Sequence, residues 1–415
     1  MAMIIKRDYY LQQLISSKSN NLIKIVTGIR RSGKSFLLFN LFHNHLIETG
    51  ISEDHIIEIA LDDRLNKNLR DPDVILRHIH ERIVDDKLYY IILDEVQMID
   101  EFTDVLNSLL HIRNADVYVT GSNSKFLSKD VVTEFRGRGD EIHLFPLSFA
   151  ELYNSIGGDK FELWKSYYTY GGLPGILELD SEKKKAAYLR SLHETVYLKD
   201  IIERNNLKNC EEFMELMRVM ASCIGSPCNP SKLENTFKSV KNETLDRKTI
   251  SKYLSYMEDA FLIEKSMRYD IKGRKYIGTL SKYYFQDIGL RNALLNFRQV
   301  EENHIMENVI YNELRLRGFC VDVGMVEART AKERKQLEVD FVANMADRRY
   351  YIQSAFAMPD DDKREQESAS LKRIDDSFKK IIIMRDDIKP YHDNNGFYIV
   401  GLMDFLLKPD LIEQL

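Results

Sequence analysis

The chain has 415 residues, of which 44% are hydrophobic and 30% are charged, and its net charge is −6. This composition is typical of a globular protein with about two to four domains, and it excludes a protein that binds polyanions through its overall charge. The four cysteines form no C-x-x-C pair, which argues against zinc and favours reduced thiols. The first residues lack the apolar core of a signal peptide, and no apolar run is long enough to span a membrane. We therefore expect a cytoplasmic protein with no membrane partner.

A glycine-rich motif follows the first predicted strand. Residues 5–19 have the spacing of an amphipathic helix, and residues 22–26 are the apolar, β-branched run of a buried strand. Residues 28–35 then read Gly-Ile-Arg-Arg-Ser-Gly-Lys-Ser, the G-x-x-x-x-G-K-S pattern of a phosphate-binding loop. An apolar helical stretch begins at residue 36. The order strand, loop, helix is the one that the motif requires, and it disfavours the alternative of a glycine-rich turn with an incidental lysine.

The physical chemistry of this loop predicts an ATP site. Gly28 and Gly33 permit backbone angles at which successive N–H groups turn toward one anion, and the next helix adds positive charge at its N-terminus. Lys34 is expected to reach the β- and γ-phosphates, and the Ser35 hydroxyl to ligate Mg²⁺. The residues predicted to bind the nucleotide are Gly28, Arg30, Arg31, Ser32, Gly33, Lys34, Ser35 and Phe36.

Two carboxylates follow a second apolar strand. Asp71 is a predicted helix cap, and the apolar residues 88–93 predict a strand that is buried on both faces. Asp94 and Glu95 come directly after it, at the strand end where a parallel sheet places its ligand. We expect Asp94 to hold the Mg²⁺ shell through water and Glu95 to be the general base for the attacking water.

Polar residues near the end of the next strand predict two further catalytic groups. After residues 117–120, Asn123 or Ser122 is expected to donate a hydrogen bond to the γ-phosphate or the water; the alternative is a plain turn with Asn123 in the left-handed conformation. Arg138, with Arg136 close behind, is predicted to be an arginine finger that acts on a neighbouring subunit, which implies a homo-oligomer. Solvated or salt-bridged arginines are the alternative.

Taken together, these motifs resemble a prokaryotic AAA-type P-loop ATPase family. Its members pair an AAA domain with a C-terminal domain of unknown function of the DUF4143 type. The resemblance extends over essentially the whole chain and implies ATP binding and hydrolysis, with Mg²⁺. The motifs that carry it lie at residues 27–35, 93–97, 120–124, 136–138, 145–149, 170–174, 307–314 and 338–341.

The middle of the chain predicts a helical lid, with a long helix at 181–205, and then a winged helix, in which Asn229 is expected to cap a short helix. Residues 229–298 contain 14 Lys and Arg residues against 8 Asp and Glu residues, and this local positive charge marks a candidate for nucleic-acid binding. A helix at 246–256 is expected to enter the major groove, and a hairpin at 261–285 to grip phosphates. Binding of protein partners by the same fold is the open alternative. The predicted DNA-binding residues are Arg247, Lys248, Thr249, Lys252, Lys272, Arg274 and Lys275.

The last segment resembles a restriction-endonuclease-like core. Such a core needs an Asp and a Glu or Gln for the metal, and a Lys for the attacking hydroxide. Asp340, Glu307 and Gln353 fit the first requirement, but position 355 is alanine where the lysine belongs. We therefore expect a degenerate nuclease, with Lys363 as a disfavoured substitute for the missing lysine.

These elements predict an α/β protein with an AAA-type ATPase core at 1–148, a helical lid at 149–208, a winged helix at 209–296 and a nuclease-like domain at 297–415. The function that they favour is an ATP-driven switch or motor that acts on double-stranded DNA. A signalling or defence ATPase that oligomerises and docks protein partners is the second hypothesis. An active ATP-dependent nuclease is the third, and Ala355 argues against it.

Overall fold

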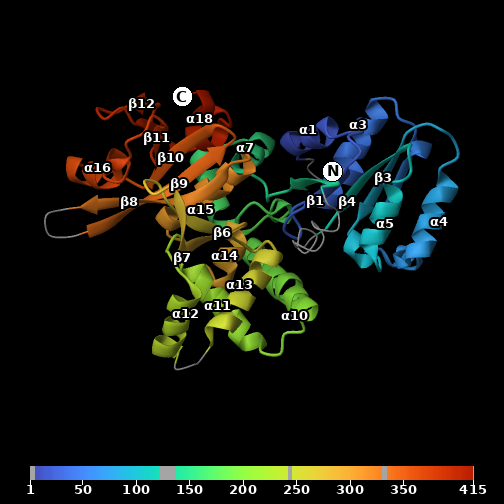
Figure 1. Cartoon of the computed structure of the whole chain (residues 1–415), viewed down its shortest axis with the longest axis horizontal. Helices are drawn as coiled ribbons and strands as arrows, with labels where there is room; N and C mark the ends of the chain where they lie inside the picture. Colours follow the sequence, from blue (N-terminus) through green and yellow to red (C-terminus); the bar gives the residue numbers. More distant parts are fainter. Residues whose placement is uncertain (1–4, 122–136, 242–244, 330–333, 415) are drawn as a thin grey trace. The chain divides into compact units, whose positions relative to one another are not determined.

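The computed structural model describes residues 5–121, 137–241, 245–329 and 334–414 (Figure 1). The chain forms two compact units. The N-terminal unit comprises Met1–Pro146 with Asp259–Phe261, and the C-terminal unit comprises Leu147–Glu258 with Leu262–Leu415. None of the described helices is both long enough and apolar enough to cross a bilayer.

The N-terminal unit is built on a five-stranded sheet with the order β2-β3-β4-β1-β5. Every neighbouring pair of strands is parallel, and β3 is buried along its whole length. This confirms the expected α/β fold, because a parallel sheet with fully buried strands needs helices over both faces. The strands are β1 Ile23–Thr27, β2 Ile56–Ala60, β3 Tyr89–Asp94, β4 Ala115–Thr120 and β5 Gly139–His143.

Helices cover both faces of this sheet. Over one face, α1 (Asp8–Ser16) packs with a helix that follows the glycine loop and consists of α2 (Lys34–Phe36), the π-helical η1 (Leu37–Phe42) and α3 (His43–Glu48). Over the other face, α4 (Pro72–Arg82) and α5 (Phe102–Leu109) bury a second apolar layer. Three short 3₁₀ helices also lie among the described residues of this unit, namely η2 Glu53–His55, η3 Arg64–Arg70 and η4 Val96–Met98.

The C-terminal unit contains an eight-stranded mixed sheet with the order β12-β13-β11-β10-β9-β8-β6-β7. The hairpin that we predicted as a wing is the pair β6–β7 at one edge of this sheet, and β6 pairs in parallel with β8. A hairpin signal is local in sequence, whereas the pairing of β6 with β8 joins distant segments. The strands are β6 Ile263–Asp270, β7 Lys275–Phe285, β8 Cys320–Arg329, β9 Arg334–Met345, β10 Arg348–Ala355, β11 Lys379–Met384, β12 Tyr391–His392 and β13 Tyr398–Gly401.

The described residues of the C-terminal unit also form helices. The long helix expected at 181–205 is continuous but includes a π-helical segment, η7 (His193–Leu198), between α9 (Glu182–Leu192) and α10 (Lys199–Asn205). The other helices are α7 Phe149–Ile156, α8 Lys160–Tyr170, η6 Pro174–Ile176, α11 Cys210–Ser222, α12 Pro230–Thr236, η8 Phe237–Lys241, α13 Arg247–Asp259, α14 Ile288–Leu294, α15 Glu302–Leu316, α16 Asp361–Ser368, η9 Leu371–Arg373, α17 Leu402–Leu407 and α18 Leu411–Gln414.

Helix caps that were expected from the sequence are present. The Asp71 carboxylate accepts hydrogen bonds from the backbone N–H groups of Asp73 and Val74 at 3.0 and 3.1 Å, at the start of α4. The Asn229 side chain accepts one from the N–H of Lys232 at 2.7 Å, at the start of α12. Each cap satisfies N–H groups that a first helical turn leaves without partners.

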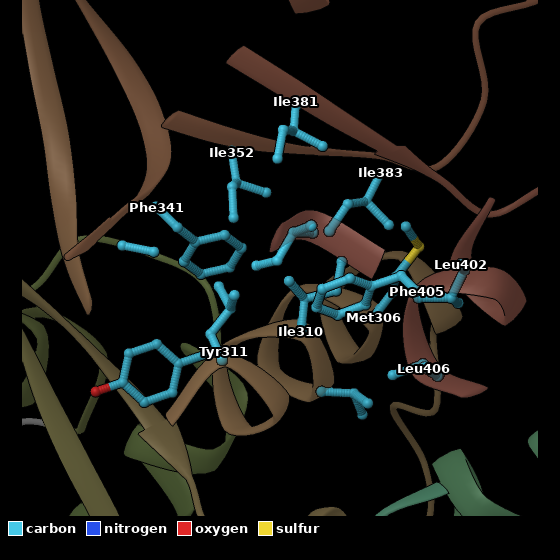
Figure 2. Close-up of a cluster of buried hydrophobic side chains, with 14 of the residues drawn as sticks. Met306, Ile310, Tyr311, Phe341, Ile352, Ile381, Ile383, Leu402, Phe405 and Leu406 are labelled. Atoms are coloured by element: carbon cyan, nitrogen blue, oxygen red, sulfur yellow. The ribbon is translucent and has the colours of Figure 1, made fainter. Parts of the chain in front are cut away.

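A large hydrophobic core lies where α15 packs on the C-terminal sheet. Figure 2 shows Met306 and Ile310 of α15 pointing toward Ile352, Ile381 and Ile383 of the strands, with side chains of α17 beside them. All of these side chains are buried. Burying a side chain of this size stabilises a fold by about 1.5–3 kcal/mol, so this packing fixes the position of α15 relative to β9 and β10.

Candidate nucleotide-binding site

The phosphate loop connects β1 to α2 and depends on residues with positive φ. Gly28 has φ +135°, Gly33 has φ +99° and Arg31 has φ +66°. A Cβ atom at Gly28 would lie 2.2 Å from the carbonyl oxygen of Leu144, and the Leu144 N–H donates to the carbonyl of Thr27 at 2.8 Å. The start of the loop is therefore pressed against the end of β5, and only glycine fits there.

The side chain of Lys34 lies inside the loop. It is buried, and its Nζ donates to the carbonyl oxygens of Gly28 and Ile29 at 3.0 and 3.1 Å. The hydroxyl of Ser32 is also buried and has no hydrogen-bond partner among the residues that the structure describes. Of the other residues predicted here, Arg31 and Ser35 are exposed, and Arg30 and Phe36 are half-buried. The loop thus offers an ammonium group and a free hydroxyl to an anion.

Arg7 holds the phosphate loop in place, and it was not among the residues predicted for the nucleotide site. Its guanidinium donates to the carbonyl of Ser32 at 3.3 Å and to that of Phe145 at 2.7 Å, and lies 4.7 Å from the centre of the Tyr10 ring. The Tyr10 hydroxyl accepts a hydrogen bond from the N–H of Phe145 at 3.2 Å. The amphipathic helix predicted at residues 5–19 was the sequence signal for this contact. Amphipathic spacing, however, does not reveal which polar side chain points toward the phosphate loop.

Asp94 lies at the end of β3 and connects the loop to the neighbouring strand. The Ser35 hydroxyl donates to Asp94 Oδ2 at 2.7 Å, and the Thr120 hydroxyl donates to Asp94 Oδ1. Burial raises the pKa of Asp94, the hydroxyls of Thr120 and Ser35 oppose that rise, and the charges of Glu95 and Asp62 add to it. The structure therefore brings the predicted Mg²⁺ residues Ser35 and Asp94 together.

Glu95 has a strained backbone, and its side chain is held in place. Its φ is +54°, a left-handed conformation that costs a residue other than glycine about 1–2 kcal/mol. Its N–H donates to the Thr120 hydroxyl at 2.9 Å, and Gln97 donates to its carboxylate. Strain of this kind concentrates at functional sites. Thr120 therefore bridges both carboxylate residues, a role that the sequence analysis did not assign to it.

Of the residues predicted to sense the γ-phosphate or to act as an arginine finger, the structure describes Arg138. Asn123, Ser122 and Arg136 lie outside the described residues. Arg138 is exposed, and its guanidinium donates to Asn107 of α5 at 3.2 Å. Its carbonyl accepts from the N–H of Ile23 at 2.9 Å, which places Arg138 beside the start of β1, whereas the phosphate loop follows the end of that strand. A five-residue strand separates the two by about 15 Å.

The predicted DNA-binding residues of α13 lie at its first turns. Arg247, Lys248 and Lys252 are exposed, and Arg247 lies 3.6 Å from a Glu234 carboxylate oxygen. The Thr249 hydroxyl, by contrast, donates to the carboxylate of Asp246 at 2.7 Å and belongs to the cap of the helix. On the β6–β7 turn, Lys272, Arg274 and Lys275 are all exposed.

The residues predicted for a nuclease-like site meet around a lysine that the sequence analysis missed. Lys282 of β7 is buried, and its Nζ lies 2.7 Å from Glu307 Oε1, 2.8 Å from Glu338 Oε1 and 3.8 Å from Asp340 Oδ1. Gln353 accepts from the N–H of Asp340 at 3.4 Å. Lys282 was missed because it lies on the predicted wing, far from Asp340 in sequence.

The charges in this cluster compensate each other. Burial and the charge of Glu307 raise the pKa of Asp340 to about 8, although Lys282 acts in the opposite direction. Burial acts to lower the pKa of Lys282, but the surrounding carboxylates outweigh it and raise that pKa. Ala355 is buried in a hydrophobic cluster, and Lys363 pairs with Glu367 of its own helix. Among the described residues, no group of three or more His, Cys, Asp or Glu side chains could hold a metal ion.

The N-terminal unit belongs to a definite class of protein. A parallel sheet, a glycine loop after β1 and a buried aspartate at the end of β3 define a P-loop domain of the AAA type. The family model described as an AAA domain matches residues 20–153. The model that matches residues 161–301 is described as a domain of unknown function, DUF8612. This corrects the expectation of DUF4143, which rested on short motifs in the C-terminal half.

Two relatives match nearly the whole chain. An uncharacterized protein of Haemophilus influenzae is 33% identical over 414 residues, which are 98% of this chain and 99% of that protein. An uncharacterized protein of Methanocaldococcus jannaschii is 29% identical over 393 residues, which are 90% of this chain and 82% of that protein. The chain therefore belongs to the same family as the Haemophilus influenzae protein, and it carries an AAA domain.

The solved structures that match this chain are more distant. The Aeropyrum pernix Orc1 protein in complex with DNA is 12% identical, with a TM-score of 0.32, and the match covers 71% of this chain and 93% of that one. The Saccharomyces cerevisiae Hsp104 in a casein complex is 12% identical, with a TM-score of 0.34, and the match covers 66% of this chain and 58% of that one.

Proposed function

We propose that the protein is a Mg²⁺-dependent ATPase that binds ATP on the loop at residues 28–35. The observation that carries this proposal is the junction of Ser35, Asp94 and Thr120, in which one buried carboxylate has two neutral hydroxyl partners. An anionic group that is buried without a countercharge is costly. A divalent cation that arrives with the nucleotide would supply that charge.

The residues present fit ATP with Mg²⁺. The N–H groups of the loop and the Lys34 ammonium would bind the phosphates, with Lys34 exchanging its bonds to Gly28 and Ile29 for phosphate oxygens. Ser35 would ligate the metal, and Asp94 would hold its water shell. The bound Mg²⁺ would neutralise charge on the leaving phosphates. Glu95, which Gln97 and Thr120 hold in place, would accept the proton of the attacking water.

The test is ATP hydrolysis by the full chain, measured as phosphate release, together with ATP binding by calorimetry. We expect Lys34→Met to abolish both, because the methionine keeps the apolar stem of the buried side chain and removes only the ammonium. Lys67→Met replaces an exposed lysine of the same unit and should leave both unchanged. Wild-type protein that gives no heat with Mg²⁺ and ATP would contradict the proposal.

We further propose that the ATPase cycle acts on double-stranded DNA through the first turns of α13. Arg247, Lys248 and Lys252 support this, because they are exposed on one short stretch of helix and could contact phosphates and base edges. Thr249 is the weakest of the predicted contacts, since its hydroxyl already caps the helix. Changing the three basic residues to Glu should weaken binding of a DNA duplex in a filter-binding assay and reduce its salt dependence. Unaltered affinity would rule out this surface.

The position of Arg138 supports a homo-oligomer in which this arginine acts on a neighbouring chain. It lies at the opposite end of β1 from its own phosphate loop, so it could reach a transferring phosphate only on another molecule. In mixtures of Arg138→Ala and Glu95→Gln chains, a finger in trans should partly restore hydrolysis, because some interfaces combine an intact Glu95 with an intact Arg138. Mixtures no more active than the separate variants would contradict it.

A further inference from the structure

A cavity of about 690 Å³ lies in the C-terminal unit, where two turns of the sheet come together. The β6–β7 turn contributes Lys272 and Arg274, the β9–β10 turn contributes Asp347, and the start of β10 contributes Arg348 and Arg349. Phe378 lies just before β11. This volume is within the range of about 300–1,000 Å³ that is usual for small-molecule sites. Neither the carboxylate cluster at Lys282 nor the loop at residues 28–35 contributes to its lining.

Positive charge at the cavity is available to a ligand. Lys272 and Arg274 are exposed and make no ion pair with any residue that the structure describes. Arg349 is held in position, because its Nε donates to Asn344 Oδ1 at 2.7 Å and its guanidinium lies 5.5 Å from the centre of the Tyr269 ring and 5.3 Å from that of Phe378. Arg348 is already paired with Glu413 at 2.6 Å. Lys272 and Arg274 can therefore meet a phosphate, and Arg349 adds positive charge from a fixed position in the lining.

The acidic residues of the lining narrow the choice of ligand. Asp376 accepts from the Tyr351 hydroxyl at 2.6 Å and from the N–H of Phe378 at 3.2 Å, so protein groups already use its oxygens. Asp347 and Asp375 are exposed and would repel a bare polyanion. They suit a ligand that carries N–H or O–H donors as well as a negative charge. A nucleotide has both, in its base or sugar and in its phosphate.

An exposed aromatic ring lies at the same place. Phe378 lines the cavity and is 38% exposed, so part of its ring is accessible to a ligand. Aromatic side chains next to cationic groups are the usual platform for a nucleobase, because every base can stack on a ring whatever its sequence. Size, mixed charge and the ring thus favour the same class of ligand.

We propose that this cavity binds one nucleotide unit, with its phosphate at Lys272, Arg274 and Arg349 and its base on Phe378. The unit could come from a free nucleotide or from single-stranded nucleic acid, which share this chemistry. The proposal does not depend on ATP hydrolysis at the phosphate loop or on the basic face of α13.

The test uses the full chain, fluorescein-labelled (dT)₁₂ followed by fluorescence anisotropy, and AMP as a competitor. We expect Lys272→Ala with Arg274→Ala to weaken (dT)₁₂ binding about tenfold or more, and Phe378→Ala to weaken it about fivefold or more. Lys275→Ala is the matched control, because Lys275 begins β7 directly after this turn and is exposed but does not line the cavity. It should change the affinity less than twofold.

Each competition or variant experiment distinguishes one source of the bound nucleotide unit or one binding surface from another. Competition by AMP in Lys34→Met protein identifies free nucleotide as the ligand, and binding of (dT)₁₂ without such competition identifies the strand. Retained (dT)₁₂ binding in the Arg247, Lys248 and Lys252 variant separates this site from α13. Absence of saturable binding, equal loss with Lys275→Ala, or competition by polyglutamate as strong as by nucleotide would overturn the proposal. Thermal unfolding confirms that the variants are folded.

Discussion

Two buried aspartates, one in each unit, have different kinds of partners for their carboxylate groups. Burial raises the pKa of both Asp94 and Asp340. Asp94 is hydrogen-bonded by the hydroxyls of Ser35 and Thr120, whereas Asp340 shares the Lys282 ammonium with Glu307 and Glu338. Under the proposed function, the first carboxylate would meet a cation that arrives with the nucleotide, whereas the second lies beside an ammonium that the fold itself supplies. We interpret Asp94 as part of a catalytic site and the cluster at Asp340 as a structural scaffold.

The largest effect is expected from a substitution in the catalytic site, at Glu95. Glu95→Gln keeps the shape of the side chain but removes the base, so hydrolysis should fall by about 10²- to 10⁴-fold while ATP binding persists. Phosphate release and calorimetry measure the two quantities. Glu101→Gln is the matched control, because Glu101 is exposed and also has a positive φ, of +50°. If Glu95→Gln hydrolyses ATP at the wild-type rate, another residue is the base.

Removing the internal cation should destabilise the C-terminal unit. In Lys282→Met, Glu307 and Glu338 lose their countercharge, and the free energy of unfolding should fall by about 3–5 kcal/mol. Urea unfolding followed by the fluorescence of Trp164 reports on this unit, because Trp164 is the chain's only tryptophan and is buried there.

Lys363→Met is the control for this loss of a lysine. Its partner Glu367 lies on the same helix, and such pairs contribute only about 0.3–0.5 kcal/mol. A Lys282 variant as stable as the Lys363 variant would mean that the cluster does not need its ammonium. Divalent cations that stabilise the wild-type C-terminal unit would contradict the scaffold interpretation more directly.

Mg²⁺ with ATP should distinguish the two aspartates. At a ligand concentration of about 100 times Kd, binding stabilises the folded state by about 2.7 kcal/mol, which scanning calorimetry detects as a higher unfolding temperature. We expect this rise in the wild type and in Asp340→Asn, but a much smaller one in Asp94→Asn, where the metal shell has lost its anionic anchor. Equal rises in all three proteins would remove the distinction.

A further prediction concerns the pH dependence of stability. The pKa of Asp340 is about 8 in the folded chain and near 3.8 in the unfolded chain, so protonation favours the folded state. Its contribution to stability is fully present below about pH 4 and is lost as the pH rises through about 8. Asn at position 340 should flatten this part of the pH dependence, measured by urea unfolding with Trp164 fluorescence between pH 5 and 8. Unchanged slopes would show that Asp340 does not titrate there.

The sequence by itself determined the features that depend on neighbouring residues. The spacing of Gly28, Gly33, Lys34 and Ser35 specifies the loop, because its glycines and its lysine act on a single anion. The buried strand that ends in Asp94 could be predicted in the same way, since six apolar residues before a carboxylate are a local pattern. The α/β fold followed from these signals, and so did the helix caps at Asp71 and Asn229.

Only the tertiary structure decided which distant residues meet. Thr120 reaches Asp94 because β3 and β4 are neighbours in the sheet, and Lys282 reaches Asp340 because the predicted wing hairpin joins the same sheet as β9. No local pattern encodes either contact, since strand order depends on the packing of the whole chain. For the same reason the sequence indicated a missing lysine at position 355, whereas the fold supplies an ammonium from β7.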